Sequence, residues 1–93
     1  MHPKLDPHQI QAALPSLPGW QLQNGELVRN STFDDFKQAI NFVNHVADLA
    51  ESAGHHPDID IRYNKVRLAL VTHDAGGITT SDIDFARQID KKS

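Results

Sequence analysis

HHPDIDIRYNKVRLALVTH, residues His55–His73, is the stretch that decides the fold of this chain. Its first part, Asp58–Tyr63, alternates strictly between polar and apolar side chains, as a strand with one buried face does. Its second part, Val66–Thr72, is mostly apolar and contains β-branched residues, which favour a more deeply buried strand. The polar pair Asn64-Lys65 separates the two parts. The stretch therefore predicts an antiparallel β-hairpin that turns at Asn64-Lys65.

The position of this turn decides which residues lie opposite one another in the hairpin. A turn centred between Asn64 and Lys65 would place apolar residues such as Ile61 and Leu68 opposite each other. If the pairing continued to the end of the hairpin, His56 would lie opposite His73, with Cβ atoms about 5 Å apart. His55 directly precedes His56. The register therefore predicts that three imidazoles converge at one end of the hairpin.

A helix and a second hairpin are expected before this stretch. Asp6 is a typical N-cap, and the helix that it begins should end near Leu14. Asn24-Gly25, the strongest short hairpin signal, separates two segments of strand-like composition. These segments are Trp20–Gln23 and Glu26–Phe33.

Two amphipathic helices flank the deciding stretch. Apolar side chains recur with a helical period over Asp34–Ser52, and Gly54 is a typical residue to end that helix. Thr79, followed three residues later by Asp82, is a capping pattern that predicts the start of a last helix. That capping role alone would explain the presence of Asp82.

The resulting order is α-β-β-α-β-β-α. Four short strands and three amphipathic helices favour an α+β two-layer sandwich, with a four-stranded antiparallel sheet and all three helices on one face. A chain of 93 residues is long enough for one small hydrophobic core and too short for two. We therefore expect a single domain over residues 1–93.

Composition excludes several classes of function. Apolar residues make up 39% of the chain and charged residues 23%, which is typical of a soluble globular domain. A net charge of −3 disfavours direct binding of nucleic acid, and the absence of cysteine excludes disulfides, thiolate nucleophiles and cysteine-based metal sites. The longest apolar run, Leu68–Val71, is too short to span a membrane, and Met1–Lys4 has no signal-peptide character. We expect a cytoplasmic protein.

Six histidines are the unusual feature of the composition. His55, His56 and His73 are expected to meet just past the helix that carries Glu51, whereas His45 is expected to be an ordinary scaffold residue. Three meeting imidazoles are compatible with a catalytic or ligand site, with a zinc site, or with a purely structural cluster. Adjacent residues of an extended chain point in different directions, which argues against His55 and His56 binding one ion. No metal is therefore expected.

The spacing of these residues forms a longer pattern. Glu51 is followed after three residues by His55-His56-Pro57, then after five residues by Tyr63, after nine by His73 and after eight by Asp82. This pattern resembles the signature of the pterin-4a-carbinolamine dehydratases. The likeness covers nearly the whole chain and includes the segment Gly76–Thr79.

The resemblance implies the α-β-β-α-β-β-α fold and the activity of a hydro-lyase that needs no cofactor. Such an enzyme dehydrates 4a-hydroxytetrahydrobiopterin to quinonoid dihydropterin and so recycles the pterin of aromatic amino acid hydroxylases. By this resemblance His55, His56 and His73 are the catalytic residues. We expect His56 and His73 to be the acid/base pair, with either one as the acid, and His55 to assist. Glu51, Pro57 and Asp82 are the expected substrate-binding residues, and the two carboxylates could alternatively orient histidines.

The resemblance also implies partners. A homodimer with joined sheets, or a homotetramer, is expected, because a small domain with exposed strand edges gains from association. Phe42 and Leu49 are candidate contacts. A functional link to phenylalanine hydroxylase is expected. The alternatives are a regulatory module without catalytic activity, like the relatives that serve as dimerisation cofactors of a homeodomain transcription factor, or an accessory protein of molybdopterin metabolism.

Overall fold

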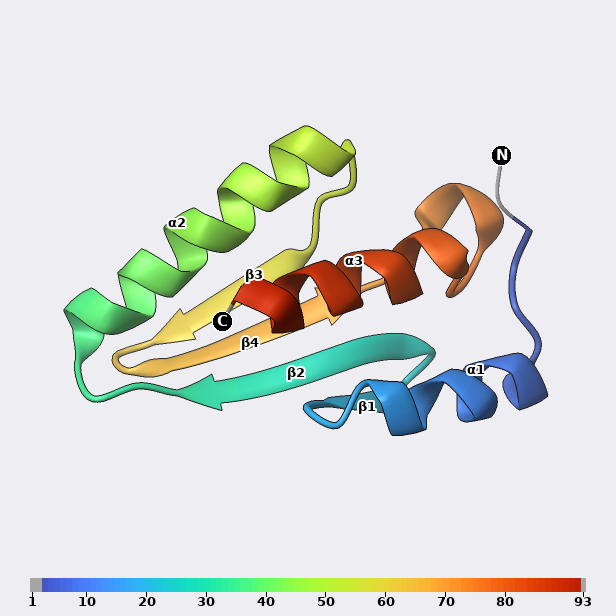
Figure 1. The fold of residues 1–93 in the computed structure, drawn as a ribbon, viewed down its shortest axis with the longest axis horizontal. Coiled ribbons are helices and arrows are strands. Elements are labelled where there is room, and N and C mark those ends of the chain that lie inside the picture. Colours follow the sequence, from blue (N-terminus) through green and yellow to red (C-terminus); the bar gives the residue numbers. More distant parts are fainter. Residues whose placement is uncertain (1–2, 93) are drawn as a thin grey trace.

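The computed structural model describes residues 3–92, so the expectation about Met1 and His2 falls outside the described residues. The elements are a four-stranded antiparallel sheet of order β1-β2-β4-β3, three α-helices and two short 3₁₀ helices (Figure 1). Their bounds are α1 Pro7–Ala13, η1 Leu14–Ser16, β1 Trp20–Gln23, β2 Glu26–Thr32, α2 Phe36–Ala53, β3 Asp58–Arg62, β4 Lys65–Leu70, η2 His73–Ala75 and α3 Thr80–Lys92. The expected α+β class and element order are confirmed.

Local signals account for the first elements. Asp6 accepts a hydrogen bond of 2.9 Å from the backbone N–H of Gln9, and the Gln9 side chain accepts one of 2.9 Å from the backbone N–H of Asp6. This reciprocal pair begins α1 as predicted. Asn24 and Gly25 both have positive φ, 50° and 79°, which is the geometry of the tight two-residue hairpin turn.

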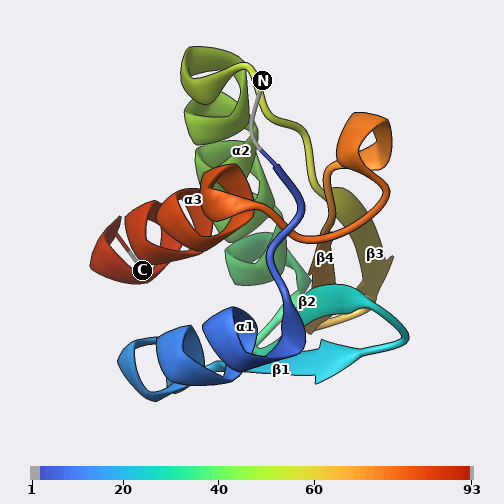
Figure 2. The ribbon, with the colours of Figure 1, turned by 90° about the vertical axis from the view of Figure 1, so that its right-hand side faces the viewer.

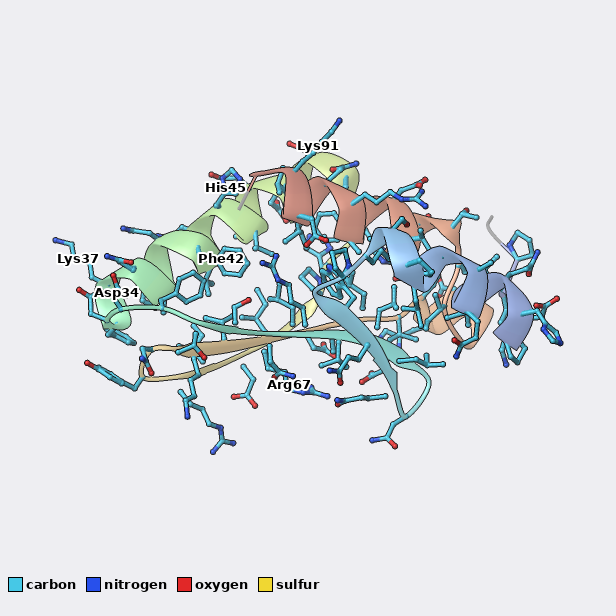
Figure 3. All side chains as sticks on the ribbon, turned by 60° about the horizontal axis from the view of Figure 1, so that its bottom comes forward. Asp34, Lys37, Phe42, His45, Arg67 and Lys91 are labelled. Atoms are coloured by element: carbon cyan, nitrogen blue, oxygen red, sulfur yellow. The ribbon has the colours of Figure 1, made fainter. Side chains whose placement is uncertain are left out.

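The central helix α2 begins after Asp35, which accepts a hydrogen bond of 2.8 Å from the backbone N–H of Gln38. It ends at Gly54, whose φ of 64° a side chain would disfavour. The role expected for Phe42 is wrong. Phe42 is only 8% exposed and points from α2 toward the sheet, where its ring lies 5.1 Å from that of Phe33 (Figure 3). Leu49 is half-buried and packs against the core, so its role as a contact stays a prediction.

The register expected for the second hairpin is wrong by two residues. Ile61 lies opposite Val66 rather than Leu68, because the turn is formed by Tyr63 and Asn64. Tyr63 adopts a φ of 55°, which is unusual for a bulky residue. The backbone N–H of Phe33 donates to the carbonyl of Asn64 at 2.8 Å, and the side-chain amide of Asn64 donates to the carbonyl of Phe33 at 2.8 Å. A shift of two residues leaves every side chain on its expected face, so the apolar pattern could not detect it.

The three helices cover one face of the sheet and leave the other open. Figure 3 shows this with the sheet seen nearly edge-on and Arg67 pointing away from the helices. Residues of α2, β4 and α3 supply most of the core between the layers, while Val28 and Ala69 are buried on the opposite face. The core side chains include Leu27, Val66, Leu68, Leu70, Ile83, Phe85, Ala86 and Ile89. No helix within residues 3–92 is long and apolar enough to cross a membrane.

Candidate active site

The end of α2 delivers two histidines to the same corner of the molecule. Gly54 reverses the chain, and the backbone N–H of His55 then donates to the carbonyl of Ala50 at 3.2 Å. His56 follows, and Pro57 leads the extended chain into β3. In Figures 1 and 2 the orange η2 loop, which begins with His73, lies near this end of α2.

His55 is held by a carboxylate that is shielded from solvent. Its Nε2 atom is hydrogen-bonded to Oδ1 of Asp82, and only 18% of the His55 side chain is exposed while Asp82 is fully buried. The other oxygen of Asp82, Oδ2, accepts from the Thr72 hydroxyl at 2.8 Å and from the Thr79 backbone N–H at 2.9 Å. All the bonds of Asp82 are thus made within the protein, which favours an orienting role over direct contact with a substrate.

His56 has a carboxylate partner of a different kind. Its Nε2 atom lies 2.6 Å from Oε2 of Glu51, and both side chains are exposed, 64% for His56 and 78% for Glu51. An ion pair in such a position is screened by water and contributes little to stability. Water can reach His56 directly, as proton exchange with solvent requires.

The three histidines line one depression, although His56 and His73 are not the cross-strand pair that the expected register predicts. Beyond β4, Thr72 forms a single antiparallel bridge to Gly77, and η2 then turns His73 into an exposed position. The depression has a volume of about 290 Å³, and its walls are Gly54, His55, His56, Val71, Thr72, His73 and Asp74.

A second depression adjoins the first at His55. Its volume is about 460 Å³, and it lies between the end of α2 and the first turns of α3. The ring of Phe85, a residue that the sequence pattern did not single out, meets the His55 ring edge-on at 6.0 Å. The walls are Ala53, Gly54, His55, Ser81, Asp84, Phe85 and Gln88.

Some expected site residues do not line the depressions themselves. Glu51 reaches the first depression through His56, Asp82 reaches it through His55 and Thr72, and Pro57 is half-buried next to His56. The hydroxyl groups of Thr72 and Thr79 were missed, because nothing in their local sequence indicates that Thr72 bonds Asp82 or that the two hydroxyls bond each other. His45 does not line either depression, and no three His, Asp or Glu side chains among residues 3–92 are grouped as metal ligands would be.

Comparison with known proteins identifies the family of this chain. The family model described as "Pterin 4 alpha carbinolamine dehydratase" matches residues 3–92. The chain belongs to the pterin-4a-carbinolamine dehydratase family. Proteins named "Putative pterin-4-alpha-carbinolamine dehydratase" are similar over nearly their whole length. One from Acidobacterium capsulatum is 60% identical over 94% of this chain and 95% of its own, and one from Chloroflexus aurantiacus is 56% identical over 96% of each.

Solved structures of this family share the fold. A "transcriptional coactivator/pterin dehydratase" from Brucella melitensis superposes with a TM-score of 0.89 at 34% identity, over 95% of this chain and 96% of that one. A "pterin dehydratase-like protein" described as a RuBisCO assembly factor in the alpha-carboxysome superposes with a TM-score of 0.62 at 25% identity, over 77% of this chain and 83% of that one. The names of these two similar proteins therefore include a pterin dehydratase, a transcriptional coactivator and an assembly factor.

Proposed function

We propose that this chain is a hydro-lyase that dehydrates 4a-hydroxytetrahydrobiopterin to quinonoid dihydropterin and water. The observation that carries the proposal is the depression with three imidazoles, two of them paired with carboxylates, in a chain of this family. Imidazole is the side chain best suited to give and take protons near neutral pH.

The chemistry requires one proton donor and one proton acceptor. The bond between C4a and the hydroxyl oxygen breaks, and a general acid protonates the departing oxygen so that it leaves as water. The N5–H proton passes to a general base, and the nitrogen electron pair forms the new double bond between N5 and C4a. One water molecule is lost and no electrons are transferred, so the step needs no redox partner.

His56 and His73 are the proposed acid/base pair. Both are exposed and line the same depression, so each can exchange its proton with water between turnovers. Glu51 would orient the imidazole of His56 and Pro57 would shape the entrance beside it. His55 assists in an orientation set by Asp82.

The direct test is to mix the protein with chemically generated 4a-carbinolamine and to follow the change in ultraviolet absorbance. We expect acceleration over buffer that depends on protein concentration. A matched control replaces His8, an exposed histidine on α1, with alanine, and this variant should keep the wild-type rate. A folded wild-type protein that gives no acceleration would reject the enzymatic proposal.

The second candidate is a module that binds a protein partner without catalysis. It is favoured by the names of the two solved relatives, a coactivator and an assembly factor. Roles beside phenylalanine hydroxylase or in molybdopterin metabolism, and a location in the cytoplasm, stay predictions of the same standing. The absorbance assay separates the two candidates, because a binding module would leave the carbinolamine at its uncatalysed rate.

We also propose that two copies associate through β3. It is an outer strand of the sheet, so one side of its backbone has no neighbouring strand within residues 3–92. Within one chain, Nε of Arg62 lies 3.7 Å from Oδ1 of Asp60. If two β3 strands paired antiparallel about Asp60, Asp58 would lie opposite Arg62 of the partner subunit. This pairing would also set Ile59, which is 37% exposed, opposite Ile61 of the partner subunit. Such a dimer, or a tetramer built from two of them, would cover this edge.

A further inference from the structure

A chain of hydroxyl groups lies behind His55, and its proton directions can be worked out. The Thr72 hydroxyl has a single proton, which it donates to Oδ2 of Asp82 at 2.8 Å. The Thr72 oxygen also lies 2.9 Å from the hydroxyl oxygen of Thr79. Because the Thr72 proton is already committed, the proton between the two hydroxyls must belong to Thr79. Thr79 therefore donates to Thr72.

The other hydrogen bonds around Thr72 and Thr79 run in the same direction, from donor toward Asp82. Thr79 is fully buried, and its hydroxyl oxygen accepts from the backbone N–H of Ser81 at 3.2 Å. Its own backbone N–H donates to Oδ2 of Asp82 at 2.9 Å. All donors therefore point toward Asp82, and hydrogen bonds aligned in this way strengthen one another. The arrangement presents Asp82 with two donors at Oδ2 and leaves Oδ1 for His55.

The carboxylate of Asp82 decides which nitrogen of the neutral His55 ring carries the proton. A carboxylate accepts hydrogen bonds and does not donate them, so Nε2 of neutral His55 must carry the proton that is shared with Oδ1 of Asp82. A neutral imidazole has one N–H, and Nδ1 therefore carries the lone pair. Nδ1 of His55 makes no hydrogen bond within the part of the chain that the structure describes.

We infer that Thr72 and Thr79 are positioning residues, which hold Asp82 so that neutral His55 keeps its proton on Nε2 and offers Nδ1 to the site as a hydrogen-bond acceptor. The group that it receives from a ligand is then an N–H or an O–H donor. The catalytic consequence rests on the proposed dehydratase function, in which such a group is carried by the pterin. The tautomer itself does not depend on any activity.

Within residues 3–92, no hydroxyl group holds the carboxylate of Glu51, the partner of His56. Glu51 is 78% exposed and is bonded to no other side chain than His56 within residues 3–92. The imidazole of His56 can thus rotate or exchange its proton with water. The chain of hydroxyl groups distinguishes the two neighbouring histidines. The donor and acceptor nitrogens of the neutral His55 ring are fixed, and those of His56 are not.

The test uses nitrogen-15 NMR of the histidine rings in the full chain, at a pH where the imidazoles are neutral. In the wild type, His55 should show a protonated Nε2 and an unprotonated Nδ1. Thr72→Val keeps the shape of the side chain but removes the hydroxyl, so the Nδ1–H tautomer should become populated and kcat/KM should fall by about tenfold. Thr72→Ser returns the hydroxyl and should rescue both measurements. Thr32→Val, on the open face of the sheet, is the matched control.

Asp82→Asn provides a stronger variant. The amide oxygen should take the position of Oδ2, where two donors converge, which turns the NH₂ group toward Nε2 of His55. His55 must then accept at Nε2, and its proton should move to Nδ1 with a roughly 10²-fold loss of kcat.

A wild-type His55 with its neutral-state proton on Nδ1 would overturn the inference, whether or not any variant folds. Ring-nitrogen shifts that stay at their wild-type values in both Thr72→Val and Asp82→Asn would also overturn it. A protein with the Nε2–H tautomer and the expected variant shifts, but without dehydratase activity, would reject the proposed function and support the inference.

Discussion

Trp20 on β1 and Asp90 on α3, 70 residues apart in the chain, are joined by a hydrogen bond of 3.0 Å from Nε1 to Oδ1. Arg29 on β2 reaches the same oxygen at 3.1 Å, and its guanidinium lies 5.5 Å from the centre of the Phe42 ring. One carboxylate near the end of the last helix thus ties the first hairpin to the helical layer. It satisfies an indole N–H that would otherwise be enclosed without a partner.

Asp90→Ala should lower the free energy of unfolding by about 1–2 kcal/mol, because a partly buried indole donor and a guanidinium lose their shared acceptor. For a chain of this size the melting temperature should fall by roughly 4–12 °C. Thermal and urea unfolding measure the effect. Asp84→Ala is the control, because its pairing with Arg87 at 3.6 Å is exposed and its loss should change stability by less than about 0.5 kcal/mol. Equal effects of the two substitutions would contradict the role of Asp90.

Asp82→Ala and Glu51→Ala should differ sharply in stability. The first removes an acceptor that serves three donors in the interior and should cost about 3 kcal/mol. The second removes an exposed partner of His56 and should fall within about 0.5 kcal/mol of wild type. Urea unfolding curves for both variants give the comparison. A loss for Glu51→Ala as large as that for Asp82→Ala would show that burial does not separate the two pairs.

His56→Ala and His73→Ala should each lower kcat by roughly 10²-fold or more, because each removes a group that moves a proton in the transition state. Both side chains are exposed, so the melting temperature should hardly change. Steady-state kinetics beside thermal melts test this. If both folded variants keep near wild-type kcat, the histidines are structural and the proposed division of roles fails.

Turnover should survive exhaustive chelation. The proposed step needs only an acid and a base, and the imidazoles supply both. Activity is measured before and after treatment with a strong chelator, and again after zinc is added back. A loss that zinc restores would replace the acid/base proposal with a metal-dependent one.

The wild-type chain should sediment as a dimer or tetramer at micromolar concentration. Ile59→Lys puts a charge into the proposed pairing of β3 strands and should shift the protein toward monomer. The side chain is already partly exposed, so its replacement should leave the circular dichroism spectrum unchanged. The matched substitution Leu22→Lys, of equal exposure on β1 at the other edge, should leave the association intact. A wild-type monomer of 10.4 kDa would refute the proposal.

Features encoded in short segments could be predicted from the sequence. The caps at Asp6 and Thr79, the turn at Asn24-Gly25 and the stop at Gly54 each depend on a few adjacent residues, and each occurs where expected. The element order follows from them. The meeting of the three histidines was also anticipated, but for the wrong reason, since the expected cross-strand pair does not form.

What could not be predicted depends on contacts between distant segments. The position of the second turn depends on Tyr63 accepting a positive φ while Asn64 bonds Phe33, some thirty residues earlier. The burial of Phe42 depends on how α2 is rotated over the sheet, which helical periodicity leaves open by about one residue. Of the partners of Asp82, only Thr79 follows from a local capping pattern, whereas His55 and Thr72 come from separate segments that no local pattern links to it.

Asp82 bonds the backbone N–H of Thr79 at the start of α3 and also bonds His55, so the first helical turn and the histidine depend on one carboxylate. A local opening that frays the start of α3 would also free the imidazole of His55, so the site stays ordered only while the first turn of α3 is formed. The lifetime of the competent site is thus bounded by the opening rate of a single helical turn. Slow amide exchange at Asp82 and Ile83, whose N–H groups bond the Thr79 carbonyl at 3.1 and 3.3 Å, would report on that lifetime directly.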